Sequence, residues 1–374
     1  MKKFAKLVGI VVIGLIVLGA SAAFATSTTH SNLEGSHEEK IASYVKNYVI
    51  EEDFSGSVLV VKKGKVILNQ SFGLADRESK IPFSNDMLFQ VGSMAKSMIA
   101  IAILKLEEEG KISVHDKLSK YFQDIPNSNK ITIHEMLNHS SGLVDFLETK
   151  EIRKNYSEEH SEEQILNSFK NEPLSFEPGE EFAYTNSAYY LLGKIIEEVS
   201  GEEYASFIEK NIFKKAGMDE THIMTKESLK NVKVKGYENG KKAEQIDPAL
   251  LFASGNVLST KMDMAKYLEA IDTDTLISPQ QKEKMLSPTI KVNPFGIGYG
   301  YGWYTGNGLM SFNEKFQGHG GSLPGLRVGI SHFPEKEISI IIFNNTGSEW
   351  NYAELSNGIA SILLNKRQWF IHKL

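Results

Sequence analysis

The sequence contains no cysteine, so disulfide bridges, thiolate catalysis and cysteine-ligated zinc are excluded. It also lacks an excess of basic residues, because 41 Lys and Arg stand against 47 Asp and Glu and leave a formal charge of −6. Without a basic stripe, nucleic acid is not expected as a partner. The sequence has no H-E-x-x-H motif or comparable ligand spacing, and we therefore expect neither a metal nor another cofactor.

Charge is scarce at the N-terminus, where three lysines before residue 7 are the only charged residues among the first 25. An apolar run at residues 7–19 follows, and Ala-Phe-Ala at residues 23–25 is typical of a signal-peptide cleavage site. Residues 1–25 are predicted to be a signal peptide or an uncleaved membrane anchor, because the uncharged stretch is long enough to span a bilayer. Both alternatives place the protein outside the cytoplasm, secreted or anchored to the outer face of the membrane, with membrane contact only through this segment.

Residues 26–36 are small and polar and are predicted to form a flexible tether, which leaves residues 37–374 as one large domain. Both ends of this domain show strand patterns, whereas its middle shows helical periodicity. We predict helices at 37–52, 93–109, 131–138, 162–170, 187–199, 203–213, 261–271 and 349–364, a hairpin of strands 56–62 and 65–72 turning at Lys63-Gly64, and strands at 302–304, 308–316, 326–333 and 337–344. The aromatic, glycine-rich stretch 298–303 is interpreted as an edge strand.

This order of elements predicts an α/β plus all-α fold. An antiparallel β-sheet is built from both ends of the domain, flanked by N- and C-terminal helices, and interrupted by a helical insertion. We place the sheet subdomain at residues 37–88 and 290–374, and the helical subdomain at about residues 89–289.

Ser93-Met-Ala-Lys96 is the first motif with chemical content. A spacing of three residues places a hydroxyl and an amine on one helix face, and the start of a helix favours developing negative charge. The alternative is that Ser93 caps the helix while Lys96 is solvated. A lysine so early in an apolar helix is poorly placed for full solvation, which favours a catalytic role. The same pattern at Ser43-Tyr-Val-Lys46 lies within the first amphipathic helix and is interpreted as chance.

The motif Tyr184-Thr-Asn186 lies on a predicted loop just ahead of an apolar helix, a position at which catalytic side chains are often held. A phenol is a poor base at neutral pH, but a neighbouring ammonium such as that of Lys96 is expected to lower its pKa. A second copy of the pattern, Tyr237-Glu-Asn239, lies in a turn by composition and is set aside.

The third motif is His319-Gly-Gly321, within a glycine-rich stretch at residues 318–325. Such a segment can offer a backbone N–H group to a developing oxyanion, although it can also be a loose turn. It is not the glycine motif of lipases, because those enzymes need a G-x-S-x-G elbow further along and this chain has none.

Together the three motifs resemble the serine β-lactamase and penicillin-binding-protein family, in its class C and low-molecular-mass D,D-peptidase branch. The resemblance covers nearly the whole chain after the N-terminal segment. It includes Leu137-Asn-His-Ser-Ser-Gly-Leu143, Phe176-Glu-Pro-Gly179, Gly217-Met-Asp-Glu-Thr221, Ser254-Gly-Asn-Val-Leu-Ser-Thr260 and Tyr301-Gly-Trp303. It implies an active site in the crevice between the sheet domain and the helical domain.

The resemblance also implies roles for individual residues. Ser93 is the acylated nucleophile, and Lys96 and Tyr184 share its proton, with the primary base left open. Asn186 is expected to contact the substrate amide. The backbone N–H groups of Ser93 and Ser322 form the oxyanion hole, and the remaining substrate-binding positions that it implies are His319 and Gly321.

The third motif departs from the commonest form in that family, Lys-Thr/Ser-Gly. His319 is mostly neutral at pH 7 unless a carboxylate raises its pKa, and Gly320 has no hydroxyl to bind a substrate carboxylate. A hydrogen bond to a charged group contributes about 1.5–3 kcal/mol, so we expect weak carboxylate binding and disfavour a strong β-lactamase. Arg327 could supply the missing charge, but we interpret it as an ordinary exposed strand residue. His134 and His139 are interpreted as capping or packing residues.

The sequence therefore predicts an exported serine hydrolase with a covalent acyl-serine intermediate. The favoured activity is that of a D-alanyl-D-alanine carboxypeptidase-like, penicillin-binding D-peptidase on cell-wall-type peptides. Its partners would be small peptide, ester or β-lactam substrates and peptidoglycan. An esterase or a weak class C-like β-lactamase is the enzymatic alternative. A non-catalytic wall-binding or sensing protein is the alternative of another class, against which the intact Ser, Lys and Tyr set argues.

Overall fold

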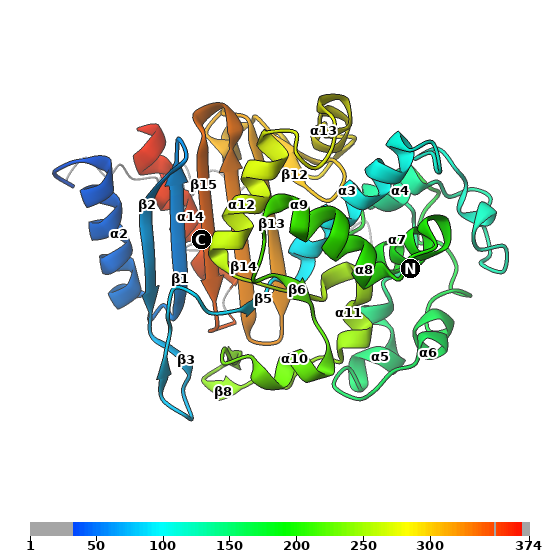
Figure 1. Cartoon of the computed structure of the whole chain (residues 1–374), viewed down its shortest axis with the longest axis horizontal. Helices are drawn as coiled ribbons and strands as arrows, with labels where there is room; N and C mark the ends of the chain where they lie inside the picture. The colour runs from blue at the N-terminus through cyan, green and yellow to red at the C-terminus, as the bar shows by residue number, and fades with distance from the viewer. Residues whose placement is uncertain (1–32, 348, 369–374) are drawn as a thin grey trace, which may run out of the picture. The chain divides into compact units, whose positions relative to one another are not determined.

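The computed structural model describes residues 33–347 and 349–368 (Figure 1). These described residues divide into two compact units, one formed by residues 33–54 and 349–368 and the other by residues 55–347. The predicted signal peptide or anchor and most of the predicted tether lie outside the described residues. Within the described ranges, none of the helices combines the length and the apolar character that crossing a membrane requires.

The first unit contains two helices, α2 (His37–Glu51) and α14 (Glu349–Leu364), which lie where the sequence predicts them. Helix α2 begins with a capping box, in which Ser36 and Glu39 each accept a hydrogen bond from the other's backbone N–H. The two helices contact each other, and the Tyr48 hydroxyl donates a hydrogen bond of 3.4 Å to Glu354 between them.

The second unit is built on an antiparallel sheet of eight strands in the order β10-β11-β12-β13-β14-β15-β1-β2. Their bounds are β1 Gly56–Lys62, β2 Lys65–Phe72, β10 Ile290–Lys291, β11 Ile297–Tyr299, β12 Tyr304–Gly306, β13 Phe316–Leu323, β14 Leu326–Phe333 and β15 Ile338–Asn344. Because β1 pairs with β15, the N-terminal hairpin joins the C-terminal strands into one sheet, as predicted. The hairpin turns at Lys63 and Gly64, which both have positive φ, the geometry that twisted two-residue hairpins favour.

Helices fill the part of the chain between these strands. Their bounds are α3 Ala95–Glu108, α4 Ile133–Leu137, α5 Lys150–Lys154, α6 Glu162–Asn167, α7 Asn186–Ser200, α8 Tyr204–Ile208, α9 Lys214–Ala216, α10 Lys226–Asn231, α11 Pro248–Gly255, α12 Lys261–Asp272 and α13 Pro279–Leu286. Short helical turns and strands complete the unit: η1 Gly92–Met94, η2 Leu118–Lys120, η3 Phe146–Glu148, η4 Glu209–Phe213, η5 Leu309–Ser311, η6 Pro334–Lys336, β3 Leu74–Asp76, β4 Ile81–Pro82, β5 Phe89–Gln90, β6 His222–Ile223, β7 Tyr237–Glu238, β8 Lys241–Lys242 and β9 Val257–Ser259. Helix α12 packs against β15 and β1, while most other helices gather beside the sheet in Figure 1.

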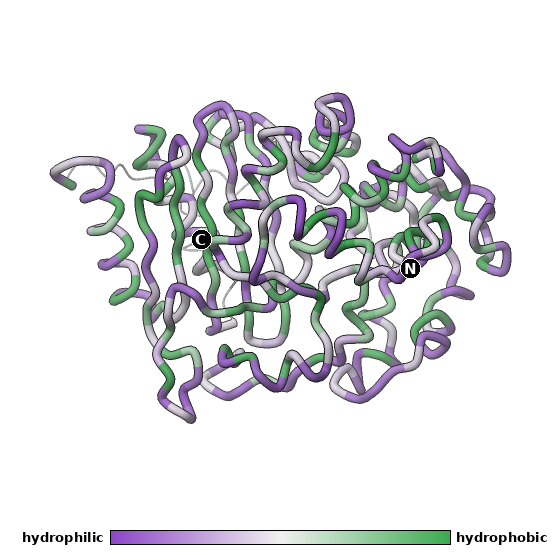
Figure 2. The backbone as a smooth tube through the Cα atoms, viewed as in Figure 1, coloured by the Kyte–Doolittle hydropathy of each residue, from purple (hydrophilic) through white to green (hydrophobic). Residues whose placement is uncertain are grey.

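Helix α3 is the centre of the helical region. Every residue from Ala95 to Leu104 is buried, and the helix packs against α7 and α11. Figure 2 shows a comparable hydrophobic run along β15, all seven residues of which are buried. A helix that is apolar all round must lie inside the molecule, and the polar Lys96 in its first turn is therefore buried with it.

Two strand predictions are wrong, and the strand predicted at 302–304 begins two residues later, as β12. Residues 308–315 form η5 and a loop, and only Phe316 lies in a strand, as the first residue of β13. Phe312 and Asn313 in the loop have left-handed backbone conformations that an extended strand cannot contain. The stretch 298–303 is not an edge strand, because β11 lies between β10 and β12 and the aromatic side chains beyond it are buried.

Candidate active site

Ser93 lies in η1, the single turn that leads into α3. Its side chain makes no capping hydrogen bond at the start of either helix, so the alternative that Ser93 is a helix cap is wrong. The residue is partly exposed and lines a cavity of about 270 Å³. A buried turn thus presents one hydroxyl to an open pocket.

Lys96 is fully buried, which excludes the alternative of a solvated side chain. Its Nζ atom lies 3.1 Å from Ser93 Oγ, 2.7 Å from Asn186 Oδ1 and 2.9 Å from the Ser254 carbonyl oxygen. Burial lowers the pKa of Lys96 to about 7, and the carboxylate of Asp145 opposes this effect. Near neutral pH the amine is therefore available in its uncharged form.

The three neighbours of Nζ determine what the uncharged amine can do. Asn186 Oδ1 and the Ser254 carbonyl oxygen can only accept hydrogen bonds. A neutral amine has two hydrogens, which these two oxygens take. Its lone pair then points to the remaining neighbour, the Ser93 hydroxyl, and is placed to accept the hydroxyl proton.

Asp145 holds the amide of Asn186 in the required orientation, although none of the three sequence motifs contains this residue. Its Oδ2 atom accepts a hydrogen bond of 2.8 Å from Asn186 Nδ2 and one of 3.2 Å from the Asn186 backbone N–H. The amide oxygen consequently faces Lys96. The only signal was position, because Asp145 follows the motif Leu137–Leu143 by two residues.

Tyr184 is buried beside the same group, and Lys96 Nζ lies 4.9 Å from its ring centroid. Its hydroxyl has no hydrogen-bond partner of ordinary geometry among the described residues. The nearby Ser93 hydroxyl favours the ionised form of the phenol and thereby acts to lower its pKa. Burial dominates and raises the pKa of Tyr184 well above its usual range. The expectation that Lys96 lowers this pKa is therefore wrong, and Tyr184 is a neutral phenol.

His319 lies on β13 within a buried aromatic cluster. Its Nε2 atom is 3.0 Å from the Tyr299 hydroxyl and its Nδ1 atom is 2.6 Å from the Gly320 carbonyl oxygen. Burial lowers the pKa of His319 to about 3, so the ring is neutral. It does not line the pocket that contains Ser93, and a direct contact with substrate stays a prediction. His139 is also buried, with its ring centroid 4.1 Å from that of Tyr184, in agreement with a packing role.

Gly321 allows β13 to approach η1 closely. A Cβ atom at this position would lie 2.0 Å from the Val91 carbonyl oxygen and 3.4 Å from the Ser93 nitrogen. From the other side, a Cβ on Gly92 would lie 3.3 Å from the Ser322 nitrogen. The backbone nitrogens of Ser93 and Ser322 therefore come close together, as two oxyanion donors must.

The pocket brings together Ser93, Asn186, Ser254 and Ser322, which are contributed by four separate parts of the chain. Arg327 also lines it and is only half-buried, with its Nη1 atom donating to two carbonyl oxygens of the β13–β14 turn. The interpretation of Arg327 as an ordinary exposed strand residue is therefore wrong. Arg327, and not a residue of the third motif, therefore places a permanent positive charge at the pocket.

Comparisons with known proteins identify similar sequences and similar folds. PbpX of Bacillus subtilis, a protein named for penicillin binding, is 30% identical over 323 residues, which span 85% of this chain and 78% of its own. The octameric penicillin-binding protein homologue from Pyrococcus abyssi has a TM-score of 0.76 and 31% identity, over 87% of this chain and 77% of its own. A D-amino acid amidase from Ochrobactrum anthropi shares the fold, with a TM-score of 0.76 and 21% identity over 87% of this chain and 99% of its own.

The profile of the family described as Beta-lactamase matches residues 41–363, which contain all three motifs. These residues include the whole sheet and every side chain of the site described above. The chain belongs to this family of serine hydrolases, which the β-lactamases share with the penicillin-binding proteins.

Proposed function

We propose that this protein is an exported serine hydrolase that forms an acyl-enzyme on Ser93 and acts on D-amino-acid-containing peptides of the cell-wall type. The activity would be that of a D-alanyl-D-alanine carboxypeptidase. The observation that carries the proposal is the environment of Lys96, whose lone pair is directed to the Ser93 hydroxyl by two carbonyl oxygens. Relatives named for penicillin binding support the same substrate class.

In the first step, Ser93 Oγ attacks the substrate carbonyl carbon while its proton passes to Lys96 Nζ. The oxyanion is stabilised by the N–H groups of Ser93 and Ser322, and the loss of one such donor typically costs 10²–10³ in rate. The neutral phenol of Tyr184 is suited to protonate the leaving amine, and Lys96 returns a proton to it. Water then attacks the ester by the reverse route and releases the second product.

The electrostatics of the pocket bear on the choice between peptide, ester and lactam. The neutral ring of His319 offers no charge to a substrate carboxylate, which makes a strong β-lactamase less suitable. Arg327 at the pocket is the candidate to bind that carboxylate instead. An esterase or a weak β-lactamase remains the alternative activity.

The test is covalent labelling of the purified protein with a fluorescent penicillin and with a fluorophosphonate. Labelling of the wild type and none of Ser93→Ala is expected. Equal labelling of both would remove Ser93 as the nucleophile, and labelling of neither would favour a non-catalytic wall-binding protein. Turnover of a D-Ala-D-Ala tripeptide, nitrophenyl esters and a chromogenic cephalosporin would then rank the activities.

Export, followed by secretion or by anchoring to the outer face of the cytoplasmic membrane, is part of this proposal. It is supported by the N-terminal sequence pattern at residues 1–25. Fractionation of producing cells, followed by N-terminal sequencing of the protein, would distinguish a cleaved signal peptide from a membrane anchor. Recovery of the intact chain from the cytoplasm would contradict both.

A further inference from the structure

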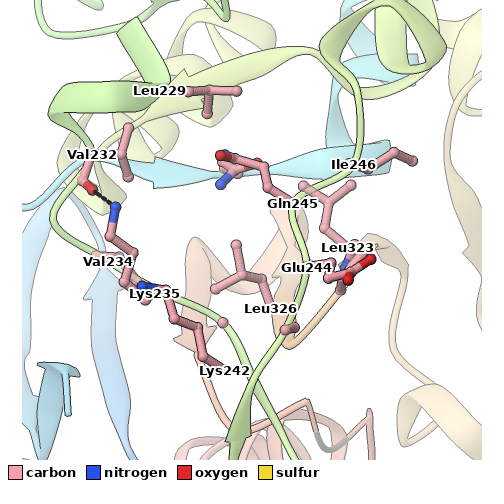
Figure 3. A pocket seen from close by; sticks show the side chains of 14 residues that line it. Leu229, Val232, Val234, Lys235, Lys242, Glu244, Gln245, Ile246, Leu323 and Leu326 are labelled. Carbon is pink, nitrogen blue, oxygen red and sulfur yellow. Dashed lines mark hydrogen bonds between the residues drawn. The ribbon is translucent and has the colours of Figure 1, made fainter. Parts of the chain in front are cut away.

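The Tyr184 phenol depends on its immediate surroundings for its position. Tyr184 lies in the segment just before α7, and its hydroxyl is buried without a hydrogen-bond partner of ordinary geometry among the described residues. It lines neither the pocket of Ser93 nor the neighbouring cavity of about 210 Å³, which Figure 3 shows. A side chain that donates a proton must be held within reach of the acceptor. The residues that contact Tyr184 and its backbone neighbours therefore decide whether it can act.

His139 contacts the chain on both sides of Tyr184. Its carbonyl oxygen accepts a hydrogen bond of 2.9 Å from the Ala183 N–H, and its Nδ1 atom accepts one of 3.2 Å from the Thr185 N–H. Between these two hydrogen bonds the imidazole lies against the Tyr184 ring, with 4.1 Å between the ring centroids and 35° between the planes. One residue thus holds the backbone before Tyr184, the backbone after it, and the side chain itself.

His139 lies at the end of a helix, at a position where glycine is the usual residue. It follows Asn138, the C-cap of α4, and its φ of +62° is in the left-handed region. The next residue, Ser140, donates a backbone hydrogen bond of 2.9 Å to the Glu135 carbonyl oxygen, which is the long hydrogen bond of a Schellman motif. Histidine adopts this conformation more often than most residues, but glycine adopts it without strain. Ending the helix therefore does not explain why the residue is histidine.

The imidazole of His139 also carries an unsatisfied donor. Because Nδ1 accepts a hydrogen bond from a backbone N–H, the proton of the neutral ring is on Nε2. Nε2 is buried and has no hydrogen-bond partner among the described residues. A buried N–H group without a partner costs free energy, which an apolar side chain would avoid. Burial and the positive charge of Lys96 lower the pKa of His139 well below its usual range, so the ring stays neutral.

We infer that His139 is a positioning residue, which holds the Tyr184 phenol in the orientation that protonates the leaving amine. It acts through the hydrogen bond at Nδ1 and through the ring face that lies against Tyr184. This role accounts for a histidine at a site where the backbone favours glycine and the buried Nε2–H favours an apolar side chain. The role depends on the proposed function, in which Tyr184 protonates the amine that leaves as Ser93 is acylated.

The test compares two substitutions of nearly the same shape in the full-length protein. Asparagine tolerates the left-handed conformation and offers a side-chain oxygen close to the position of Nδ1, whereas leucine offers no acceptor. The specificity constant kcat/KM is measured for an N-acetyl-D-Ala-D-Ala peptide and for a 4-nitrophenyl ester. His139→Leu should lower the ratio of peptide to ester by about 10- to 100-fold, because a displaced phenol misses the leaving amine while nitrophenolate needs no proton. His139→Asn should keep this ratio about 2- to 10-fold above that of the leucine variant, the range of one hydrogen bond.

A double-mutant cycle separates positioning from packing. In the Tyr184→Phe background no phenol hydroxyl is left to displace, so His139→Leu should change the peptide-to-ester ratio by no more than about twofold. Equal losses in both backgrounds would overturn the inference, because His139 would then act independently of the phenol. A residue that only packs would lower the rates on both substrates alike, and an unchanged ratio in His139→Leu would therefore overturn it as well. His115→Leu, at an exposed position, is the control and should leave the ratio unchanged.

Because each ratio is measured within one preparation, it does not depend on how much of a variant is folded. The outcomes that overturn the role of His139 leave the acyl-serine mechanism in place. Absence of peptide turnover by the wild type, together with no labelling of Ser93, would instead contradict the proposed function and remove the basis of this role.

Discussion

The carboxylate of Asp145 binds Asn186 twice, at its side-chain Nδ2 and at its backbone N–H, over 2.8 and 3.2 Å. Asn186 in turn holds Lys96 at 2.7 Å. Asp145 therefore acts through Asn186 on Lys96, the proposed base. It fixes the orientation of the Asn186 amide, and it adds a negative charge near Lys96. This relationship makes Asp145 a positioning residue, with consequences for rate and for pH dependence.

Asp145→Asn should lower kcat/KM for a nitrophenyl ester by about 10- to 100-fold, because the Asn186 amide can then rotate away from Lys96. The Asp145 carboxylate raises the pKa of Lys96, so its removal should lower that pKa. The uncharged amine would then persist at lower pH, and the acidic limb of the pH–rate profile should move to lower pH. A pH–rate profile whose acidic limb stays at the wild-type pH would contradict this role. Asp116→Asn is the matched control, because Asp116 pairs with Lys120 and does not line the pocket.

Tyr184→Phe should separate substrates by their leaving groups. The burial that raises the pKa of Tyr184 makes it a proton donor, which an amine leaving group requires and a nitrophenolate does not. We expect peptide hydrolysis to fall by about 10²–10⁴, and nitrophenyl ester hydrolysis by about tenfold at most. Equal losses on both substrates would indicate that the phenol acts on Ser93 instead.

The same variant carries a stability prediction. The Tyr184 hydroxyl is buried without a hydrogen-bond partner of ordinary geometry, so its removal should cost little free energy of unfolding. Thermal unfolding of Tyr184→Phe should therefore occur at or slightly above the wild-type temperature. A marked drop in melting temperature would show that the hydroxyl has a structural role.

Local sequence patterns correctly predicted the elements whose conformation depends on residues that are close together in the sequence. The hairpin 56–72 was predicted to the residue because short apolar runs flank a Lys-Gly turn. Helix α14 was predicted with the same accuracy. The strand predicted at 308–316 failed, because the left-handed conformations of Phe312 and Asn313 depend on surroundings that no local pattern encodes.

The motifs similarly identified residues but not their environments. Ser93 and Lys96 are neighbours on one turn, so their proximity follows from spacing alone. The contact between Asp145 and Asn186 joins residues 41 positions apart, and no local pattern predicts it. The pKa of Tyr184 was predicted in the wrong direction because burial, which a sequence does not display, outweighs a nearby ammonium.

Arg327→Gln should weaken substrates that carry a free C-terminal carboxylate. A hydrogen bond between charged groups contributes about 1.5–3 kcal/mol, so kcat/KM for an N-acetyl-D-Ala-D-Ala peptide should fall by about 10- to 100-fold. The C-terminal amide of the same peptide should be affected far less. Arg153→Gln, at an exposed position, is the control, and equal losses on acid and amide would exclude carboxylate recognition by Arg327.

Lys261 should make stability depend on pH in an alkaline window. It is almost fully buried at the start of α12, and its Nζ atom contacts only neutral oxygens, those of Ser57, Gln70, Ser71 and Asn85. Burial lowers its pKa to about 7 from an ordinary value of 10.5. Between these two values the unfolded chain binds more protons than the folded one, so protonation destabilises the fold as pH decreases from about 10.5 to 7.

Lys261→Met removes this titration. The free energy of unfolding of the wild type should therefore decrease relative to that of the variant, by at most ~1.4 kcal/mol for each pH unit below 10.5, and the difference should level off below about pH 7. Urea unfolding of both proteins at pH 7, 8, 9 and 10 measures it. Parallel curves across this range would mean that Lys261 keeps its ordinary pKa in the folded protein, and that the four oxygens stabilise its ammonium as well as water does.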